Sequence, residues 1–321
     1  MDYRFLGRAG VKVSSLCLGT MNFGRSNCDE SLSRKIMEHA VENGVNFFDT
    51  ADGYSKHQSE EIIGRWLSDG GSSRRNSLVV ATKVCSKVGP AVNDRGLSRF
   101  HIFQAVEDSL KRLRTDRIDL YQCHAQDQTP IEETIRAMDD LVRAGKVLYW
   151  GTSNFQVWQI LEALYKSDQM NAVGPVTEQC GYRMTHRHPE DQLAPFCMKY
   201  GVRMLAYSPL DGGLLSGCFR KDQPIVESPR NAGEKWRKNL ENNLETIESL
   251  ARIADELGRP LTHLAYAFLY RQPHLASVVG GPSKVEHLEA ALAAMDLILS
   301  PEVLARIDAC VAPGAGPIYK R

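Results

Sequence analysis

The sequence lacks an excess of charge of either sign, since its 321 residues include 39 Lys and Arg against 39 Asp and Glu. Nucleic acids and anionic membrane surfaces bind to basic protein surfaces, so neither is an expected partner. The sequence has no run near the ~20 apolar residues of a membrane-spanning helix. Its start, Met1-Asp2-Tyr3-Arg4, has no signal-peptide pattern. We therefore predict a cytoplasmic protein without nucleic-acid or membrane partners.

Closely spaced cysteines are also missing. The closest pair among the eight cysteines is Cys17 and Cys28, so there is no Cys-x-x-Cys pair for a metal or a redox site. Disulfide frameworks are typical of short secreted chains that cannot bury a large core. This chain is long, and 43% of its residues are hydrophobic. We predict eight free thiols in a reducing compartment and no metal site.

Two familiar catalytic or nucleotide-binding loops are absent as well. Residues 212–218 have the glycine spacing of a phosphate-binding loop but lack its Lys-Ser/Thr ending. Residues 151–155 are not a nucleophile elbow, because Phe155 stands where the sharp turn needs a second glycine. Neither a P-loop nucleotide site nor a serine hydrolase is therefore expected.

What the sequence does contain is a regular alternation of short apolar runs and amphipathic segments. The runs are short and apolar enough to form strands that are buried on both faces. The predicted strands are residues 16–19, 46–49, 78–83, 118–124, 147–151, 173–179, 202–207 and 277–280.

The segments between these runs have the apolar period of helices. Residues 131–142 place four apolar side chains at steps of four, three and four, on one helix face. We expect Thr129 to cap this helix, with Pro130 in its first position and Glu132 closing a capping box. Two further stripes are Ile102, Val106, Leu110 and Leu113, and Leu244, Ile247, Ala251 and Ala254.

Eight strand–helix units without a Pro/Ser-rich linker favour one (β/α)8 barrel domain over residues 1–321. An open doubly wound sheet is the alternative. Residues 85–98 and 211–238 are two long segments that follow strands. Because the active sites of barrels lie where the strands end, we expect both segments to form pocket walls or lids.

Ionisable residues lie at or just after the ends of three successive predicted strands: Asp49, Lys83 and His124, with Tyr54 in the loop after Asp49. In a barrel these ends converge on one pocket. Any one of them alone is more often structural. Burying an amine, a carboxylate and an imidazole together costs roughly several kcal/mol of desolvation free energy. A set that is buried at this cost is more often functional than structural.

These four side chains suit proton transfer to a carbonyl oxygen. A tyrosine titrates near ~10, and a neighbouring ammonium such as that of Lys83 lowers its pKa. Asp49 would keep Lys83 protonated, and His124 would orient the carbonyl oxygen. Tyr54 would then protonate the developing alkoxide. Because none of the four is a hydride source, carbonyl reduction requires a nicotinamide in the same pocket.

These motifs resemble those of the aldo-keto reductase superfamily over residues 3–297. Asn46-Phe-Phe-Asp-Thr-Ala-Asp-Gly-Tyr54 resembles the signature around the family's catalytic Asp and Tyr. Residues 81–83 and 118–124 resemble the strands that carry its Lys and His, and residues 6–24 resemble its N-terminal β-hairpin and first strand. The resemblance implies a (β/α)8 TIM barrel with a hairpin and long substrate loops. It also implies that the catalytic tetrad consists of Asp49, Tyr54, Lys83 and His124.

The resemblance further implies a nicotinamide cofactor, for which we expect NADPH, with NADH as the alternative. Residues 150–154 resemble the segment that holds the nicotinamide carboxamide. Residues 207–210 resemble the strand end whose aromatic ring stacks on the nicotinamide, and residues 280–287 resemble the adenosine-phosphate segment. The implied cofactor contacts are Gly19, Thr20, Met21, Asp49, Ser153, Asn154, Gln179, Tyr207, Ser208, Pro209, Leu210, Gly212, Gly281, Ser283, Lys284 and His287.

The sequence departs from the family's pattern at several positions. The family often has Arg near Ser283 and Gln or Arg at the position of His287, so we expect Lys284 to supply the positive charge there. Arg183 stands where many members of the family have asparagine.

For the substrate we expect a small-molecule carbonyl compound, an aldehyde or a ketone. Residues 93–99 resemble the branch that includes bacterial members and channel subunits. The candidate substrate contacts are Phe23, Tyr54, Cys85, His124 and Trp236. One alternative is reduction of a nucleotide-linked keto sugar or enone, with cationic contacts from Arg95, Arg99, Lys235 and Arg237. Another is a nicotinamide-binding regulatory subunit with little turnover, like the potassium-channel beta subunits of this superfamily.

Overall fold

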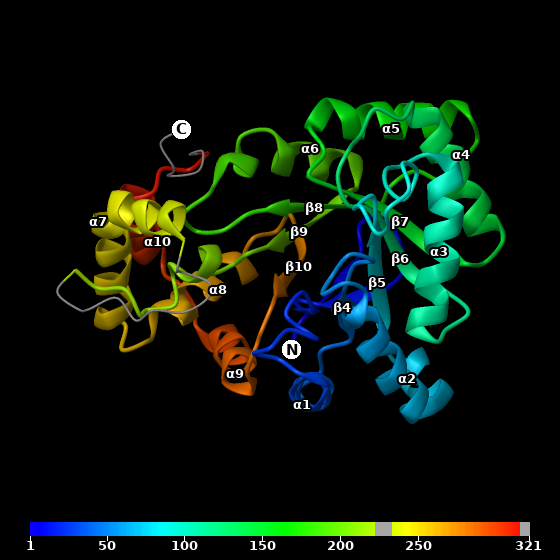
Figure 1. Ribbon diagram of the computed structural model, residues 1–321. Helices are drawn as coiled ribbons and strands as arrows, with labels where there is room; N and C mark the ends of the chain where they lie inside the picture. Colours follow the sequence, from blue (N-terminus) through cyan, green and yellow to red (C-terminus); the bar gives the residue numbers. More distant parts are fainter. Residues whose placement is uncertain (222–232, 315–321) are drawn as a thin grey trace.

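Eight parallel strands form a closed barrel, which the computed structural model describes over residues 1–221 and 233–314 (Figure 1). The strands are β3 (Leu16–Gly19), β4 (Phe47–Asp49), β5 (Val79–Val84), β6 (Ile118–Cys123), β7 (Val147–Ser153), β8 (Thr177–Gly181), β9 (Arg203–Tyr207) and β10 (Leu275–Gly280). The order β10-β3-β4-β5-β6-β7-β8-β9 closes the ring. The predicted (β/α)8 barrel is thereby confirmed, and the alternative of an open sheet is wrong.

A short antiparallel hairpin precedes the barrel, as the resemblance implied. Strand β1 (Tyr3–Phe5) pairs with β2 (Lys12–Ser14). Leu6 and Val13 are fully buried in one apolar cluster with Phe47 and Val79, the first residues of β4 and β5. The hairpin therefore closes the end of the barrel at which the strands begin and leaves the opposite end open.

The helices lie around the outside of the barrel (Figure 1). Those of the described residues are α1 (Glu30–Glu42), α2 (Gln58–Asn76), α3 (Arg99–Leu113), α4 (Ile131–Arg143), α5 (Val157–Gln169), α6 (Leu193–Tyr200), α7 (Glu234–Glu256), α8 (Leu261–Tyr270), α9 (Val285–Ala293) and α10 (Pro301–Cys310). The predicted stripes on α3, α4 and α7 all pack against the core. No helix within residues 1–221 and 233–314 is long and apolar enough to cross a bilayer.

The start of α4 differs from the prediction. The helix begins at Ile131 and its N-cap residue is Pro130, so Thr129 does not cap it. The hydroxyl and the backbone N–H of Thr129 donate instead to Asp127, at 3.1 and 2.9 Å. Glu132 pairs with Lys166 (2.8 Å) rather than closing a capping box. The hydroxyl of Thr129 is thus turned to the carboxylate of Asp127, and α4 has no side-chain cap.

The two long segments differ in their relation to the open end. No residue of 85–98 lines the cavity at that end. Leu97 N–H donates to Asp127 in the next loop (2.7 Å), and Gly96 N–H donates to the carbonyl of Cys85 within the segment (2.9 Å). Of residues 211–238, Gly212 and Gly213 line that cavity. Residues 222–232 lie outside the described part of the chain.

Candidate active site

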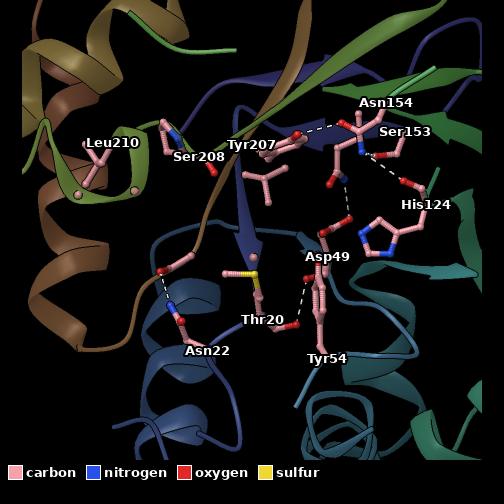
Figure 2. A pocket seen from close by; sticks show the side chains of 18 of the residues that line it. Thr20, Asn22, Asp49, Tyr54, His124, Ser153, Asn154, Tyr207, Ser208 and Leu210 are labelled. Atoms are coloured by element: carbon pink, nitrogen blue, oxygen red, sulfur yellow. Dashed lines mark hydrogen bonds between the residues drawn. The ribbon is translucent and has the colours of Figure 1, made fainter. Parts of the chain in front are cut away.

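A cavity of about 340 Å³ opens where the barrel strands end. Figure 2 shows Asp49, Tyr54 and His124 close together on one side of it, with Ser208 and Leu210 on the other. The lining residues are Gly19, Thr20, Met21, Asn22, Asp49, Tyr54, His124, Ser153, Asn154, Gln179, Tyr207, Ser208, Pro209, Leu210, Gly212, Gly213, Tyr266, Val279 and Gly281.

Lys83 and Asp49 form a fully buried ion pair beneath this cavity. Lys83 Nζ also donates to the carbonyl oxygen of Thr50 (2.9 Å) and to the hydroxyl of Tyr54 (3.3 Å). Burial alone would lower the pKa of Lys83, but the charges of Asp49 and Tyr54 and the hydrogen bonds to both together outweigh burial and hold this pKa above its usual value. Lys83 is therefore a permanent ammonium beside Tyr54.

Two amides hold the second carboxylate oxygen of Asp49. Nε2 of Gln122 and Nε2 of Gln179 both donate to Asp49 Oδ2, at 2.8 and 2.9 Å. Gln179 also donates to Gln122 Oε1 (3.1 Å). Because these groups and Lys83 donate to both carboxylate oxygens, the charge of Asp49 is satisfied without water. Gln122 was not predicted from the sequence. Its only signal there is a polar residue within the apolar strand β6.

Tyr54 stands half-buried between Lys83 and His124. Lys83 Nζ lies 5.0 Å from the centre of the phenol ring, and the His124 ring meets it edge-on at 5.8 Å. Burial raises the pKa of Tyr54 above its usual value, although Lys83 acts in the opposite direction. Lys83 thus lowers this pKa as predicted, but loss of solvent outweighs the ammonium. Tyr54 is a neutral phenol at neutral pH and can donate a proton.

His124 follows β6 and reaches the cavity from the side. Its backbone N–H donates to the carbonyl of Val84 (2.8 Å), and its Nδ1 lies 3.5 Å from Oγ of Ser86. Burial, and then the charge of Lys83, lower the pKa of His124 to about 4. The imidazole is therefore neutral near pH 7 and does not add a second cation beside Lys83.

The ends of β7 and β9 meet through side-chain hydrogen bonds in the part of the cavity wall next to His124. Asn154 adopts a left-handed conformation (φ 59°), and its Nδ2 donates to Ser153 Oγ (3.0 Å) and to the carbonyl of His124 (3.2 Å). Tyr207 OH donates to Asn154 Oδ1 (2.9 Å), as Figure 2 shows. These contacts give this wall a defined set of amide and hydroxyl groups.

Most residues that the resemblance implied as cofactor contacts line this cavity. They are Gly19, Thr20, Met21, Asp49, Ser153, Asn154, Gln179, Tyr207, Ser208, Pro209, Leu210, Gly212 and Gly281. Ser283, Lys284 and His287 do not line it but lie just beyond Gly281, at the start of α9. Asn22, Gly213, Tyr266 and Val279 line it without having been predicted. Asn22 Nδ2 donates to the carbonyl of Gly281 (2.8 Å), which joins the loop after β3 to the segment after β10.

The five candidate substrate contacts divide into two groups. Tyr54 and His124 line the cavity, whereas Phe23, Cys85 and Trp236 do not. Phe23 is fully buried in the core, and Cys85 is half-buried in the loop after β5. Trp236 packs edge-on against Phe219, with the ring centres 4.9 Å apart. In this structure these three side chains are therefore used in packing.

Glu178 is a buried carboxyl group behind the end of β7. Thr152 Oγ1 donates to its Oε2 (2.6 Å), and the backbone N–H of Phe155 donates to its Oε1 (3.1 Å). Burial raises the pKa of Glu178 to about 8, although these hydrogen bonds act in the opposite direction. The group thus supports the turn that carries Asn154. An acidic residue inside an apolar run was the sequence signal for it.

Replacing Glu178 with glutamine should change how stability depends on pH. An unfolded Glu titrates near ~4.3, so between roughly pH 4.3 and 8 the native protein keeps a proton that the unfolded chain releases. The contribution of Glu178 to the free energy of unfolding therefore falls as pH rises through this window. The amide of the substituted glutamine can accept from Phe155 and donate to Thr152 without titrating. As pH rises, we expect the free energy of unfolding of Glu178→Gln to increase relative to that of the wild type by at most about 1.4 kcal/mol per pH unit.

Chemical denaturation of both proteins at about pH 5 and about pH 8 measures this difference. Identical pH dependence in the two proteins would mean that Glu178 does not titrate in this window.

Comparison with known proteins gives consistent matches over nearly the whole chain. The model of the "Aldo/keto reductase family" matches residues 15–312. An uncharacterized oxidoreductase of Bacillus subtilis, YrpG, is 39% identical, with 98% of this chain and 97% of that protein covered. A probable voltage-gated potassium channel subunit beta of Arabidopsis thaliana is also 39% identical, with 96% of each chain covered. A putative subunit of the same kind from Schizosaccharomyces pombe is 33% identical, with 96% of this chain and 92% of that protein covered.

Proposed function

This chain belongs to the aldo/keto reductase family, and on that premise we propose that it reduces an aldehyde or ketone to the alcohol with NADPH as reductant. In the proposed reaction Tyr54 is the proton donor. The observation that carries the proposal is the contact between the Tyr54 hydroxyl and the buried ammonium of Lys83 (3.3 Å) at the cavity wall beside neutral His124. Family membership supports an oxidoreductase; the substrate class, cofactor and residue roles are our proposal.

Each of the four side chains has a distinct task in the proposed reaction. The neutral imidazole of His124 holds the carbonyl oxygen of the substrate by a hydrogen bond. As negative charge develops on that oxygen, Tyr54 transfers its phenolic proton to it. Lys83 stabilises the phenolate that remains, and Asp49 keeps Lys83 charged and in place. A proton from solvent then restores Tyr54.

The residues of the cavity fit a nicotinamide dinucleotide. When bound, NADPH supplies the hydride that reduces the carbonyl carbon. Ser153 and Asn154 offer a hydroxyl and an amide for its carboxamide, and the ring of Tyr207 offers a stacking surface. A Cβ atom at Gly281 would meet nothing closer than 3.8 Å, so the cavity wall there is backbone with open space in front of it. Lys284 would hold the 2′-phosphate at the start of α9.

The first test is oxidation of NADPH and, separately, of NADH in the presence of carbonyl compounds of different size. A suitable panel contains a small aromatic aldehyde, a vicinal diketone, an aldose and a bulky cyclic ketone. We expect carbonyl-dependent oxidation of NADPH with at least one of them. Tight binding of NADPH without turnover on any of the four would contradict the proposed reaction.

Replacing Lys284 with methionine should weaken NADPH binding selectively. The exposed ammonium at the start of α9 is the charge that would distinguish a 2′-phosphate from a hydroxyl. We expect Kd for NADPH to rise about three- to tenfold, with little change for NADH. Fluorescence titration with each cofactor measures it, and Lys111→Met on the outer surface of α3 is the matched control. An equal loss for both cofactors would show that Lys284 does not contact the 2′-phosphate.

A nicotinamide-binding subunit that assembles with another protein is the second candidate. Its support is the similarity to chains whose names describe voltage-gated potassium channel subunits beta. Turnover without any partner protein would weigh against it. Reduction of a nucleotide-linked sugar has less support. Arg99, one of the cations proposed to bind such a substrate, pairs instead with Asp140 and stacks on Phe103 (4.4 Å).

A further inference from the structure

One wall of the cavity is a short segment after β9, residues 208–213, which we name the strap. Five of its six residues, all except Asp211, line the cavity. Ser208, Asp211, Gly212 and Gly213 have positive φ angles of 57°, 50°, 65° and 104°. For Ser208 and Asp211 this conformation is unfavourable, so contacts outside the two residues must maintain it.

The strap's own backbone hydrogen bonds are short-range. Asp211 N–H donates to the carbonyl of Ser208, and Gly213 N–H to that of Leu210, both at 2.9 Å. Such bonds define two turns but do not place them against the barrel. Pro209 is buried and Leu210 packs against the core, whereas Ser208 and Gly212 are exposed. The strap also has a polar anchor in its one charged side chain, that of Asp211, which does not line the cavity.

Asp211 is anchored by an ion pair with Arg183, in the turn after β8. Arg183 Nε lies 2.6 Å from Asp211 Oδ1, and the two side chains are only 9% and 3% exposed. Thr185 Oγ1 donates to the other carboxylate oxygen of Asp211 (2.6 Å). Arg183 also lies beside the Tyr207 ring, since both side chains come within 3.4 Å of where a Cβ atom of Gly181 would be. Arg183 thus pairs with Asp211 and lies close to the ring of Tyr207.

We propose that the buried ion pair of Arg183 and Asp211 holds the strap in its binding conformation and thereby sets how tightly and how long the dinucleotide is retained. This inference rests on the proposed function of the cavity as a dinucleotide site. Arg183 and Asp211 are positioning residues in this account, because neither lines the cavity. Holding the strap in advance reduces the ordering cost that binding would otherwise incur.

A double substitution separates positioning from stability. Removing one partner of a buried ion pair leaves an uncompensated charge, whereas removing both charges is often nearly neutral for stability. In Arg183→Met/Asp211→Asn no charge remains, the asparagine tolerates the left-handed conformation, and its oxygen still accepts from Thr185. If the pair were merely structural, this double variant would regain both wild-type stability and wild-type cofactor binding.

The matched control is a second buried ion pair, that of Arg75 and Asp119 (2.8 Å; 9% and 8% exposed), which lies away from the strap. Arg75→Met/Asp119→Asn removes an ion pair of similar burial and length. It should leave cofactor binding unchanged.

The experiment measures NADPH dissociation by stopped-flow fluorescence, the Kd for NADPH, and hydrogen–deuterium exchange of the strap without cofactor. For Arg183→Met/Asp211→Asn we expect a melting temperature close to wild type, dissociation about tenfold faster and Kd raised by about the same factor. Exchange at residues 208–213 should be faster. Each single variant should be both less stable and weaker in binding.

Wild-type dissociation and wild-type strap exchange in the double variant would overturn the proposal. So would an equal acceleration in the Arg75/Asp119 control, since the effect would then be general. If the wild type binds neither NADPH nor NADH, the proposed function fails instead. The exchange measurement still decides whether the ion pair holds the strap, because it needs no cofactor.

Discussion

Tyr54→Phe should lower NADPH-dependent carbonyl reduction by about 10²–10⁴-fold, the usual contribution of a general acid. The substitution removes only the hydroxyl that Lys83 contacts at 3.3 Å, and the ring can keep its edge-on contact with His124. Because the proton moves only in the transition state, the loss should be in kcat, and the Kd for NADPH should stay within a few-fold of wild type.

Steady-state kinetics together with cofactor titration separate these effects. Tyr165→Phe, on the exposed face of α5, is the matched control and should retain wild-type activity. Loss of NADPH binding together with turnover in Tyr54→Phe would assign this residue a structural role. Retention of turnover within a few-fold would remove Tyr54 as the proton donor.

Lys83→Met should reduce the rate by a similar factor and also destabilise the protein. The methionine leaves the charge of Asp49 buried without its ion-pair partner, which typically costs about 3–5 kcal/mol of stability. The rate falls for a separate reason, because no cation remains to stabilise the phenolate of Tyr54. Urea denaturation and steady-state kinetics measure the two effects.

The double variant Lys83→Met/Asp49→Asn distinguishes these causes. It buries no unpaired charge, and the asparagine side-chain oxygen can still accept from Gln122 or Gln179, so we expect stability to return substantially while the rate stays low. If the double variant regained wild-type turnover, the charge of Lys83 would not be needed for the reaction. Activity of Lys83→Met within a few-fold of wild type would lead to the same conclusion.

The barrel could be predicted because its strands are short apolar runs that recur with helical segments between them. The convergence of Asp49, Tyr54, Lys83 and His124 also follows from position alone, since all lie at or after strand ends. Side-chain direction could not be predicted in this way. Phe23 belongs to a segment that meets the cavity, yet its ring is fully buried in the core, while the neighbouring Asn22 lines the cavity.

Burial and pairing between distant segments account for the other differences. The pKa of Tyr54 depends on how much solvent the fold removes, and this outweighs the adjacent ammonium. Gln122, from β6, and Gln179, from β8, meet at Asp49, from β4, only because the closed barrel brings their strands together. The partner of Arg183 is Asp211, which lies beyond α6 and β9 in the chain. No local pattern indicates such pairs.

The most direct test of hydride transfer in this cavity is the fate of deuterium from NADPH labelled at C4 of the nicotinamide. The wild-type protein is given each of the two C4-deuterated epimers with a carbonyl compound that it reduces, and the alcohol is analysed by mass spectrometry and NMR. We predict one deuterium on the alcohol carbon from one epimer and none from the other, because a fixed cavity presents one face of the ring. An alcohol without deuterium from either epimer, or NADPH oxidation without alcohol, would contradict direct hydride transfer in this cavity.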